Sequence, residues 1–567
     1  MASVSSSTST TTSLISNSLS SSTATTTAST SDIDWDALIT LAVDAKLSKA
    51  DSVDLKITAN DTKIAGYTEM QSLLSDVSTA AQKLRAASGT SLTSTNVFLD
   101  RAAYLTANGD VDASASLAAT VDSGAEIGTH DLTISQLAKA NKLAGTAQTS
   151  KTSDLGLDGV FSLGTGESLA SVTITADMSL AEIAEAINGV SDSSGVQASV
   201  LGVSGSDYRL VLTATATGLP ISAAASYGDD VLQTLGLTDA DGAFANELQV
   251  AQAAIFTVDG IELTRTSNDV SDVLSGVTLH LYQTTPANTS ISVEVGTDLS
   301  AVKDAIVALV DAYNAYRDFA YGQQQIPTSD NAETTALFGD GTLRNINSAL
   351  AEAVASSIGE AGMALLGLTF DSTNRLELDE TTLDSALLSD LDKIEDLLTF
   401  QMTSSSTSLL LLSRGTEEIG SFSLDIVTDS SGALVSAGIG GDSSLFTVTG
   451  TRIIGATGSK YEGYTFVYAG STSQTVSITT QTGIAELLYN TANGAANSTS
   501  GTLATLISNL DDYNVTLQAK SDDIREQAET YQTNLTNRYA EYQAAIEAAE
   551  SSLDYLETLL DTWNSSS

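Results

Sequence analysis

The side chains that could do chemistry are few, and the histidines come first. His130 and His280 are the only two histidines in the 567 residues. Neither lies in a His-Glu-x-x-His pattern, which would put two zinc ligands and a general base on one helical face. We therefore interpret both as surface or strand residues without a catalytic or metal role. The chain also has no cysteine, so it can form neither disulfides nor thiolate metal sites.

One acidic stretch imitates a calcium-binding loop. Asn108, Asp110 and Asp112 have the first three spacings of such a loop. However, Ala113 stands where the loop needs glycine, and Ala119 stands where it needs the terminal glutamate. The sequence therefore favours a solvated turn without metal.

Two other patterns are weaker. The spacing Gly164-x-Gly166-x-x-Ala170 imitates a dinucleotide-binding fingerprint, but the residues that follow have the pattern of a strand instead of a helix. Glycine turns explain it better. The pairs Asp511-Asp512 and Asp522-Asp523 fall on the polar side of a helical pattern, where carboxylates are hydrated. We predict that the chain is not an enzyme and uses no cofactor.

The clearest structural elements are at the chain ends. From about Gly501 to Trp563, apolar or small residues recur at steps of three and four, which keeps one stripe of a helix apolar. No proline or glycine follows Gly501, so the helix should extend on the order of 90 Å. A stripe of this length must be buried against another helix.

The partner is predicted at the N-terminal end, where a second row runs from Val53 to Leu84. A shorter amphipathic piece, Ile33 to Leu47, precedes it. Charge supports the pairing, because residues 501–563 carry twelve acids and three bases, whereas residues 32–88 carry nine acids and six bases. We predict a stalk of both chain ends, with the remaining residues projected outward. Two independent surface helices are the alternative.

The residues expected at this coiled-coil and assembly interface are the large apolar ones of the two rows. They are Trp35, Leu38, Leu41, Ile57, Ile64, Leu74, Leu84, Leu517, Ile524, Tyr531, Leu535, Tyr542, Ile546, Leu553, Leu556, Leu560 and Trp563.

The formal charge of −47 weighs against some partners. Nucleic-acid binding needs a basic stripe, which the sequence lacks, and anionic membrane surfaces are disfavoured for the same reason. The first 31 residues lack the basic and apolar regions of a signal peptide. The longest aliphatic run, Leu409 to Leu412, is too short to span a bilayer. We expect no nucleic acid, no membrane insertion, and export without a cleavable signal peptide.

Between the ends, strand and helix patterns alternate, which predicts an α+β multidomain protein with a helical stalk and β-rich domains. The expected segments are a disordered Ser/Thr-rich tail (1–31), an N-terminal coiled-coil leg (32–95), the first part of a β domain (96–150), an outer α/β module (151–250), the second part of the β domain (251–297), a helical domain (298–400), an inserted β domain (401–482) and a C-terminal coiled-coil leg (483–567).

Short motifs occur in a specific order: Asp32-Ile33-Asp34, the segment 254–261, Gly276-Val277-Thr278-Leu279, the segments 337–344, 366–370 and 376–379, and the segment 483–489. This order resembles that of the flagellar hook-associated protein 2 family, the filament caps of bacterial flagella. Residues 179–210 resemble a small repeat found in flagellins and cap proteins.

The resemblance implies an extracellular homo-oligomeric ring, a pentamer in the family, at the tip of the flagellum. Its terminal coils would be legs and its β modules a plate, which retains exported flagellin and promotes its folding. Flagellin and hook-filament junction proteins would be its partners, and some family members also adhere to host surfaces. The alternatives are a flagellin-like or hook-filament junction subunit and an extracellular coiled-coil adhesin.

Overall fold

The computed structural model describes the chain outside residues 1–33, 86–95, 327–334, 358–360 and 566–567. The predicted Ser/Thr-rich tail therefore lies outside the described residues. The chain divides into two compact units. The first contains Met1–Glu69, Pro327–Phe338 and Ser498–Ser567, and the second contains Met70–Ile326 and Gly339–Asn497. The domain limits given above stay a prediction.

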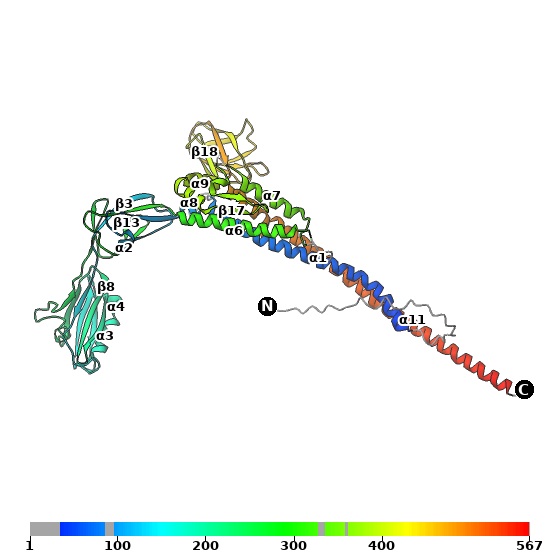
Figure 1. Cartoon of the computed structure of the whole chain (residues 1–567), viewed down its shortest axis with the longest axis horizontal. Coiled ribbons are helices and arrows are strands. Elements are labelled where there is room, and N and C mark those ends of the chain that lie inside the picture. The colour runs from blue at the N-terminus through cyan, green and yellow to red at the C-terminus, as the bar shows by residue number, and fades with distance from the viewer. Residues whose placement is uncertain (1–33, 86–95, 327–334, 358–360, 566–567) are drawn as a thin grey trace. The chain divides into compact units, whose positions relative to one another are not determined.

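The first unit is built on two long helices, α1 (Trp35–Leu84) and α11 (Thr502–Asn564), of which α1 contributes its residues up to Glu69. They lie side by side and antiparallel (Figure 1, α1 in blue and α11 in orange to red). At 1.5 Å per residue, the 63 residues of α11 span about 95 Å. The predicted pairing of the two chain ends is confirmed.

Helix α1 is continuous, whereas the sequence suggested a shorter piece before the main row. It starts after Asp34, whose side chain accepts a hydrogen bond from the backbone amide of Ala37 at 2.9 Å and so caps the first turn. Between Leu47 and Val53 there is neither glycine nor proline, so nothing ends the helix there.

The second unit contains a β-sandwich whose strands come from two separate stretches of the chain. One sheet has the order β1-β15-β3-β11-β12 and the other the order β13-β14-β2, with all neighbours antiparallel. The two sheets share one core, which includes Leu132, Phe256 and Leu279. The strands are β1 (Arg101–Asn108), β2 (Leu117–Val121), β3 (Gly128–Gln136), β11 (Ala254–Val258), β12 (Ile261–Arg265), β13 (Asp269–Leu274), β14 (Val277–Leu281) and β15 (Ser290–Thr297).

The α/β module lies between β3 and β11 in sequence. Its two sheets have the orders β10-β4-β8-β7 and β6-β5-β9. Helix α3 (Leu180–Asn188) packs on this core and begins with a capping box in which Ser179 and Glu182 satisfy each other's backbone amides. The strands are β4 (Ala140–Ala144), β5 (Gly159–Thr165), β6 (Ser168–Ile174), β7 (Val196–Ser204), β8 (Asp207–Thr217), β9 (Ile221–Gly228) and β10 (Glu247–Gln249).

The helical part of the second unit follows β15. Helix α6 (Leu299–Gln323) buries Tyr313 and Tyr316 completely. The apolar spacing from Asp379 to Phe400 fits one continuous helix, but the chain forms two, because Asp390 has a φ of −137° that interrupts helical geometry. The other helices are α7 (Gly341–Ala355), α8 (Glu380–Ser389), α9 (Leu391–Leu398) and α10 (Ile484–Ala496), and a short hairpin joins β16 (Leu368–Phe370) to β17 (Leu376–Leu378).

The predicted inserted β region is a second sandwich. Its sheets have the orders β18-β25-β20-β21 and β19-β24-β23-β22 and share an aromatic core that includes Tyr464, Phe466 and Tyr468. The aliphatic run Leu409 to Leu412 lies in one of its strands. The strands are β18 (Gln401–Ser404), β19 (Leu409–Ser413), β20 (Ser421–Thr428), β21 (Leu434–Gly438), β22 (Phe446–Thr449), β23 (Arg452–Gly455), β24 (Thr465–Tyr468) and β25 (Gln474–Gln481).

A buried ionic cluster ties this inserted sandwich to α10 and to the end of α1. Oε2 of Glu486 lies 2.5 Å from Nη2 of Arg414, and its Oε1 lies 3.4 Å from Nη1 of Arg85. The side chains of Glu486 and Arg414 are each 5% exposed. Burial raises the pKa of the Glu486 carboxyl and lowers the pKa of the Arg414 guanidinium, because desolvation penalises the charged form of each.

Taken together, the described residues form an α+β multidomain protein, as predicted. Among them, no helix is both long enough and apolar enough to cross a membrane.

Candidate assembly interface

The two helices of the first unit meet in a regular antiparallel register. The ring of Trp35 lies 4.9 Å from that of Tyr539, and the ammonium of Lys46 lies 4.3 Å from the centre of the Tyr531 ring. Further along, Asn60 donates to the Oδ1 of Asn514 at 2.8 Å. Residue numbers thus rise along α1 as they fall along α11.

Along α1, the seam positions alternate in steps of three and four residues from Ile39 to Tyr67. The best-buried cluster of the seam joins Ile39 and Val43 of α1 to Ala528 and Leu535 of α11. The alternation continues along α1 through Ala50 and the row that starts at Val53, all on the buried side. A 3–4 alternation is the repeat of a coiled coil, in which each seam residue fits between residues of the facing helix.

A charged cluster crosses the seam at Asp54. Its Oδ1 accepts a hydrogen bond from the hydroxyl of Ser521 at 2.6 Å, and its Oδ2 accepts one from Arg525 at 2.5 Å. The hydrogen bond from Ser521, followed by that from Arg525, lowers the pKa of Asp54. Because α11 is short of bases, this contact uses one of its three to hold an acid of α1.

The predicted interface residues fall into three groups. Trp35, Ile57, Ile64, Leu517, Ile524, Tyr531 and Leu535 lie buried or half-buried in the first unit, on the seam. Leu74 and Leu84 are buried in the second unit, in the last part of α1. The others, apart from the half-buried Ile546, are exposed: Leu38, Leu41, Tyr542, Leu553, Leu556, Leu560 and Trp563.

Leu38 and Leu41 are 45% and 70% exposed, because Ile39 and Val43 take the seam positions in this part of α1. The sequence could have shown this. Extending the three-four alternation backward from Val53 reaches Ala50, Lys46, Val43 and Ile39 without a break. The prediction of a separate amphipathic piece at residues 33–47 does not keep that phase. The polar seam residues Asp54, Asn514 and Ser521 were also missed, because an apolar pattern gives them no signal.

The last part of α11 extends beyond its contact with α1. Tyr539 meets Trp35 at the first residues of α1, and α11 continues over residues 540–564, which is about 38 Å of helix. Leu553, Leu556 and Leu560 are 54–60% exposed there.

The histidines form polar contacts across neighbouring strands. In His280, Nδ1 lies 2.6 Å from Oδ1 of Asp269, and Nε2 lies 3.0 Å from the hydroxyl of Thr120. His130 contacts Asp259 at 2.8 Å. The order carboxylate, imidazole, hydroxyl is that of a nucleophile triad, but the Asp269 side chain is 72% exposed on an open sheet face. Catalysis needs oxyanion donors in a water-excluded site, so this arrangement is better explained as cross-strand pairing.

The other motifs have local structural roles. Asp112 caps a short helical turn by accepting from the amide of Ala115 at 3.0 Å. Gly166 has a φ of +62° in the β5–β6 turn, and a Cβ on Gly164 would lie 1.7 Å from the Ser168 carbonyl oxygen. The glycines therefore serve a tight hairpin, as predicted.

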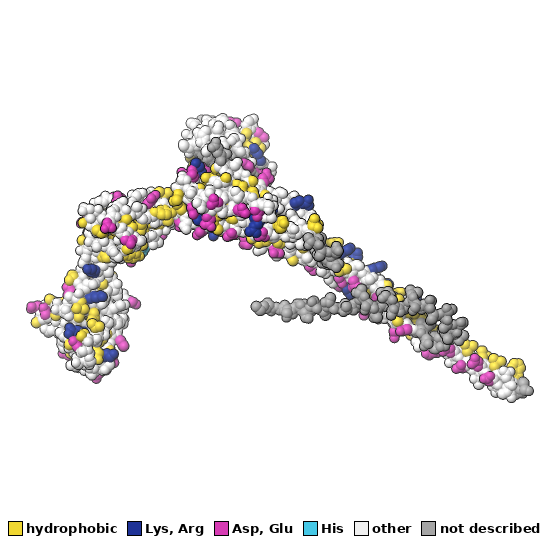
Figure 2. Space-filling model, viewed as in Figure 1, with side chains coloured by type: hydrophobic (Ala, Val, Ile, Leu, Met, Phe, Trp, Pro, Cys, Tyr) yellow, Lys and Arg dark blue, Asp and Glu magenta, His cyan; other side chains and the backbone are white. Residues whose placement is uncertain are grey.

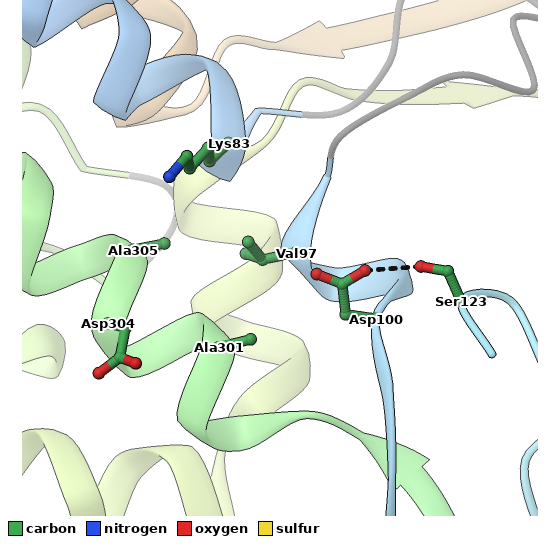
Figure 3. Close-up of a pocket in the computed structure, with 7 residues that line it drawn as sticks. All are labelled: Lys83, Val97, Asp100, Ser123, Ala301, Asp304 and Ala305. Atoms are coloured by element: carbon green, nitrogen blue, oxygen red, sulfur yellow. Dashed lines mark hydrogen bonds between the residues drawn. The ribbon is translucent and has the colours of Figure 1, made fainter. Parts of the chain in front are cut away.

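A cavity of about 490 Å³ lies in the second unit between the end of α1 and the start of α6 (Figure 3). Asp100 and Ser123 point toward each other on one side of it, and the Ser123 hydroxyl donates to Asp100 at 2.6 Å. Lys83 and Asp304 also line it. The Ser123 hydroxyl is therefore bound to the Asp100 carboxylate, and no histidine among the described residues lines the cavity to activate it as a nucleophile.

The fold and the interface define a modular assembly protein, in which paired terminal helices carry β-rich domains. The match to a known family is extensive. The model described as flagellar hook-associated protein 2 C-terminus matches residues 251–551, that of the N-terminus matches residues 31–141, and the flagellin hook IN motif matches residues 160–216. The chain belongs to the flagellar hook-associated protein 2 family, as its motifs indicated.

Individual proteins of this family are similar to the chain over much of its length. The B-type flagellar hook-associated protein 2 of Pseudomonas aeruginosa is 30% identical over 330 residues, which cover 55% of this chain and 68% of that protein. Flagellar hook-associated protein 2 of Escherichia coli K12 is 28% identical, with 64% and 80% covered. Among solved structures, the D1-D2-D3 domains of the Escherichia coli flagellar cap protein FliD match with a TM-score of 0.43 and 27% identity, covering 59% of this chain and 90% of that one.

Proposed function

We propose that this chain is the structural cap of a bacterial flagellar filament, located at the filament tip outside the cell. Membership of the flagellar hook-associated protein 2 family over most of the chain carries this proposal. The paired terminal helices support it, because a cap needs a stiff element that spans the distance between a plate and the filament end.

In this function, several copies form a ring, a pentamer by resemblance to the family. The ring retains exported flagellin beneath it. A vacant site under the cap would favour the folded, docked flagellin subunit, so that polymerisation follows from confinement without covalent chemistry. Hook-filament junction proteins would be the first partners, before any flagellin is added. We propose no enzymatic activity. Adhesion to surfaces stays a prediction.

The exposed end of α11 is the proposed contact with these flagellar partners. Figure 2 shows hydrophobic side chains along its last turns, where Leu553, Leu556 and Leu560 repeat at steps of three and four. Residues 541–561 carry six acids and no base. A helix from a partner would therefore bind best if its apolar stripe were flanked by lysine or arginine.

The test is deletion of the gene followed by inspection of cells and medium. We expect cells without filaments and monomeric flagellin in the medium, both restored by the intact gene. A chain with Leu556→Asp and Leu560→Asp should fold normally, since both side chains are exposed, but should fail to restore filaments. Restoration by a matched Ala519→Asp chain, altered on the exposed side of α11, would show that added charge alone is harmless. Intact filaments after deletion would rule out the cap function.

A further inference from the structure

The two flanks of the seam between α1 and α11 carry opposite charge. On α1, three lysines each come directly before a seam residue, whereas four aspartates each come directly after one. Because successive residues of a helix are about 100° apart, these two sets lie on opposite flanks of the seam. The lysines are Lys49, Lys56 and Lys63, and the aspartates are Asp44, Asp51, Asp54 and Asp61.

Helix α11 extends both sets, since residues that follow the seam on one helix meet those that follow it on the other. Arg525 follows the seam on α11, and it contacts Asp54 at 2.5 Å and Asp51 at 3.6 Å. Lys520 comes directly before the seam and therefore lies on the other flank, near the level of Lys56. The seam positions of α11 are Leu510, Asn514, Leu517, Ser521, Ile524, Ala528, Tyr531 and Leu535.

These flanks are called here the lysine side and the acidic side of the stalk. Over residues 38–68 of α1 and 509–536 of α11, the positions directly before the seam hold four bases and one acid, Asp523. The positions directly after the seam hold seven acids and one base, Arg525. The acids are Asp44, Asp51, Asp54, Asp61, Asp511, Asp522 and Glu529.

The lysines of the lysine side are available to a partner outside their own chain. Lys49, Lys56, Lys63 and Lys520 are exposed, and within the part of the chain that the structure describes none of them forms an ion pair. Residues 34–69 and 502–564 together carry nineteen acids and seven bases, so unpaired lysines are unexpected in this stalk. The lysine side can therefore bind an acidic surface of another molecule.

A second copy of this chain offers such a surface at the matching height. Copies related by rotation about one axis are at equal height and share one direction, so each residue faces residues of similar number in its neighbour. Only two positions along α1 separate Asp51 from Lys49, Asp54 from Lys56, and Asp61 from Lys63. Two positions are about 3 Å along a helix, so three acid–lysine pairs would form together. Orientations that bring two acidic sides together are repulsive.

We infer that, in the oligomer, the lysine side of each stalk packs against the acidic side of the next copy, over residues 44–63 of α1. The contact joins two different surfaces, so it passes from copy to copy in one direction and can close into a ring of any number of copies. It would be about 29 Å long. Exposed ion pairs are individually weak, so this contact acts together with others that hold the ring. The inference rests on the proposed self-association and identifies two surfaces through which it occurs.

The chain contains no cysteine, so introduced cysteines report directly on this contact. Thr58 lies on the acidic side and Thr516 on the lysine side, both exposed and at nearly the same height. We would isolate the oligomer of full-length Thr58→Cys/Thr516→Cys by gel filtration with light scattering and treat it with a short bismaleimide. Denaturing electrophoresis should show a ladder of linked chains that ends at the ring size. Each single-cysteine chain is the matched control and should stay unlinked, because like sides do not meet.

Charge reversal tests the pairing. Lys49→Glu/Lys63→Glu and Asp51→Lys/Asp61→Lys should each slow cross-linking roughly tenfold, since two attractive pairs in each contact become repulsive. The four changes in one chain should restore the rate, because both sides of every contact are then reversed. The lysine reversal leaves the contacts of Asp54 intact, so its helical circular dichroism signal should be unchanged. Lys142→Glu/Lys151→Glu adds the same charge at exposed residues of the α/β module and should leave the cross-linking rate unchanged.

The other outcomes are distinct. An oligomer that forms without the ladder would overturn this contact and leave the cap function standing. Dimers from either single-cysteine chain would show that like sides meet, which also contradicts the inference. Thr516→Cys carrying a photo-activated cross-linker, mixed with purified flagellin, tests the other occupant, and capture of flagellin in place of a second copy would overturn the self-contact. Absence of any oligomer would overturn both the contact and the proposed ring.

Discussion

The buried cluster around Glu486 gives the sharpest prediction about stability. Replacing Glu486 with glutamine keeps the size of the side chain but removes the carboxylate that contacts both Arg414 and Arg85. At 4 Å and an effective dielectric constant of about 20, a pair of unit charges attracts by about 4 kcal/mol, and both arginines lie within that distance. Leaving an arginine buried without its partner costs about 3–5 kcal/mol. Glutamine can still accept one hydrogen bond, so we expect the lower end of this range, about 3 kcal/mol.

This change should be visible by differential scanning calorimetry. The cluster joins the inserted sandwich to α10, so the transition that contains both should shift. For a cooperative unit of about 150–250 residues, each kcal/mol lowers the melting temperature by about 2–4 °C, which predicts a shift of about 6–12 °C. Two controls separate the causes. Glu418→Gln removes an exposed acid from the same domain and should change little. Glu486→Leu combined with Arg414→Met should recover much of the loss, because a well-packed apolar pair avoids desolvation. A shift below about 2 °C for Glu486→Gln would refute the argument.

Three further predictions concern the stalk and two buried tyrosines of the second unit. Leu535→Ala in the seam should destabilise the α1–α11 pairing by about 2–5 kcal/mol, measured as a lower urea midpoint of the helical circular dichroism signal; an unchanged midpoint would contradict burial of Leu535 in the seam. The hydrogen bond from the Ser521 hydroxyl lowers the pKa of Asp54, so the contribution of this contact to stability is present above the ordinary value of 3.8 and is lost as the pH falls through the lower folded value. Asp54→Asn should therefore make stalk stability less sensitive to pH in that acidic range. An unaltered acid profile would argue against the contact. Burial raises the pKa of Tyr313 and Tyr464 to about 12 each, so their contribution to stability is present below the ordinary tyrosine value of about 10 and is lost as the pH rises through about 12. Between these two pH values, near-ultraviolet absorbance should show that both stay protonated while exposed tyrosines ionise. Ionisation of every tyrosine in the folded protein in that range would contradict their burial.

Much of the fold could be predicted from local patterns. The two helical rows, the helix that Ser179 caps and the strands around Phe256 each show a period in the sequence that matches their burial. The phase of residues 35–50 was recoverable too, because a coiled-coil repeat extends without interruption from Val53 back to Ile39.

Other features could not be predicted from the sequence. Arg85, Arg414 and Glu486 come from three distant parts of the chain, and no local period relates them. The break at Asp390 depends on one backbone angle within a segment whose apolar spacing fits a continuous helix. The sequence identifies the apolar residues of the stalk, but the polar contacts of Asp54 with Ser521 and Arg525 depend on the register of α11, which lies almost 500 residues away.

That separation has a consequence for how the stalk can form. The hydrogen bonds between α1 and α11 join residues 453 to 471 positions apart, so they close very long loops. Contacts of such high order form late, after the domains between them have had time to fold. Until α11 is available, the seam of α1 has no cover, and a chain shortened before α11 leaves Ile39 and Val43 exposed to proteases and to aggregation. Closure of the stalk therefore marks the arrival of the last helix, and resistance of α1 to proteolysis would report it.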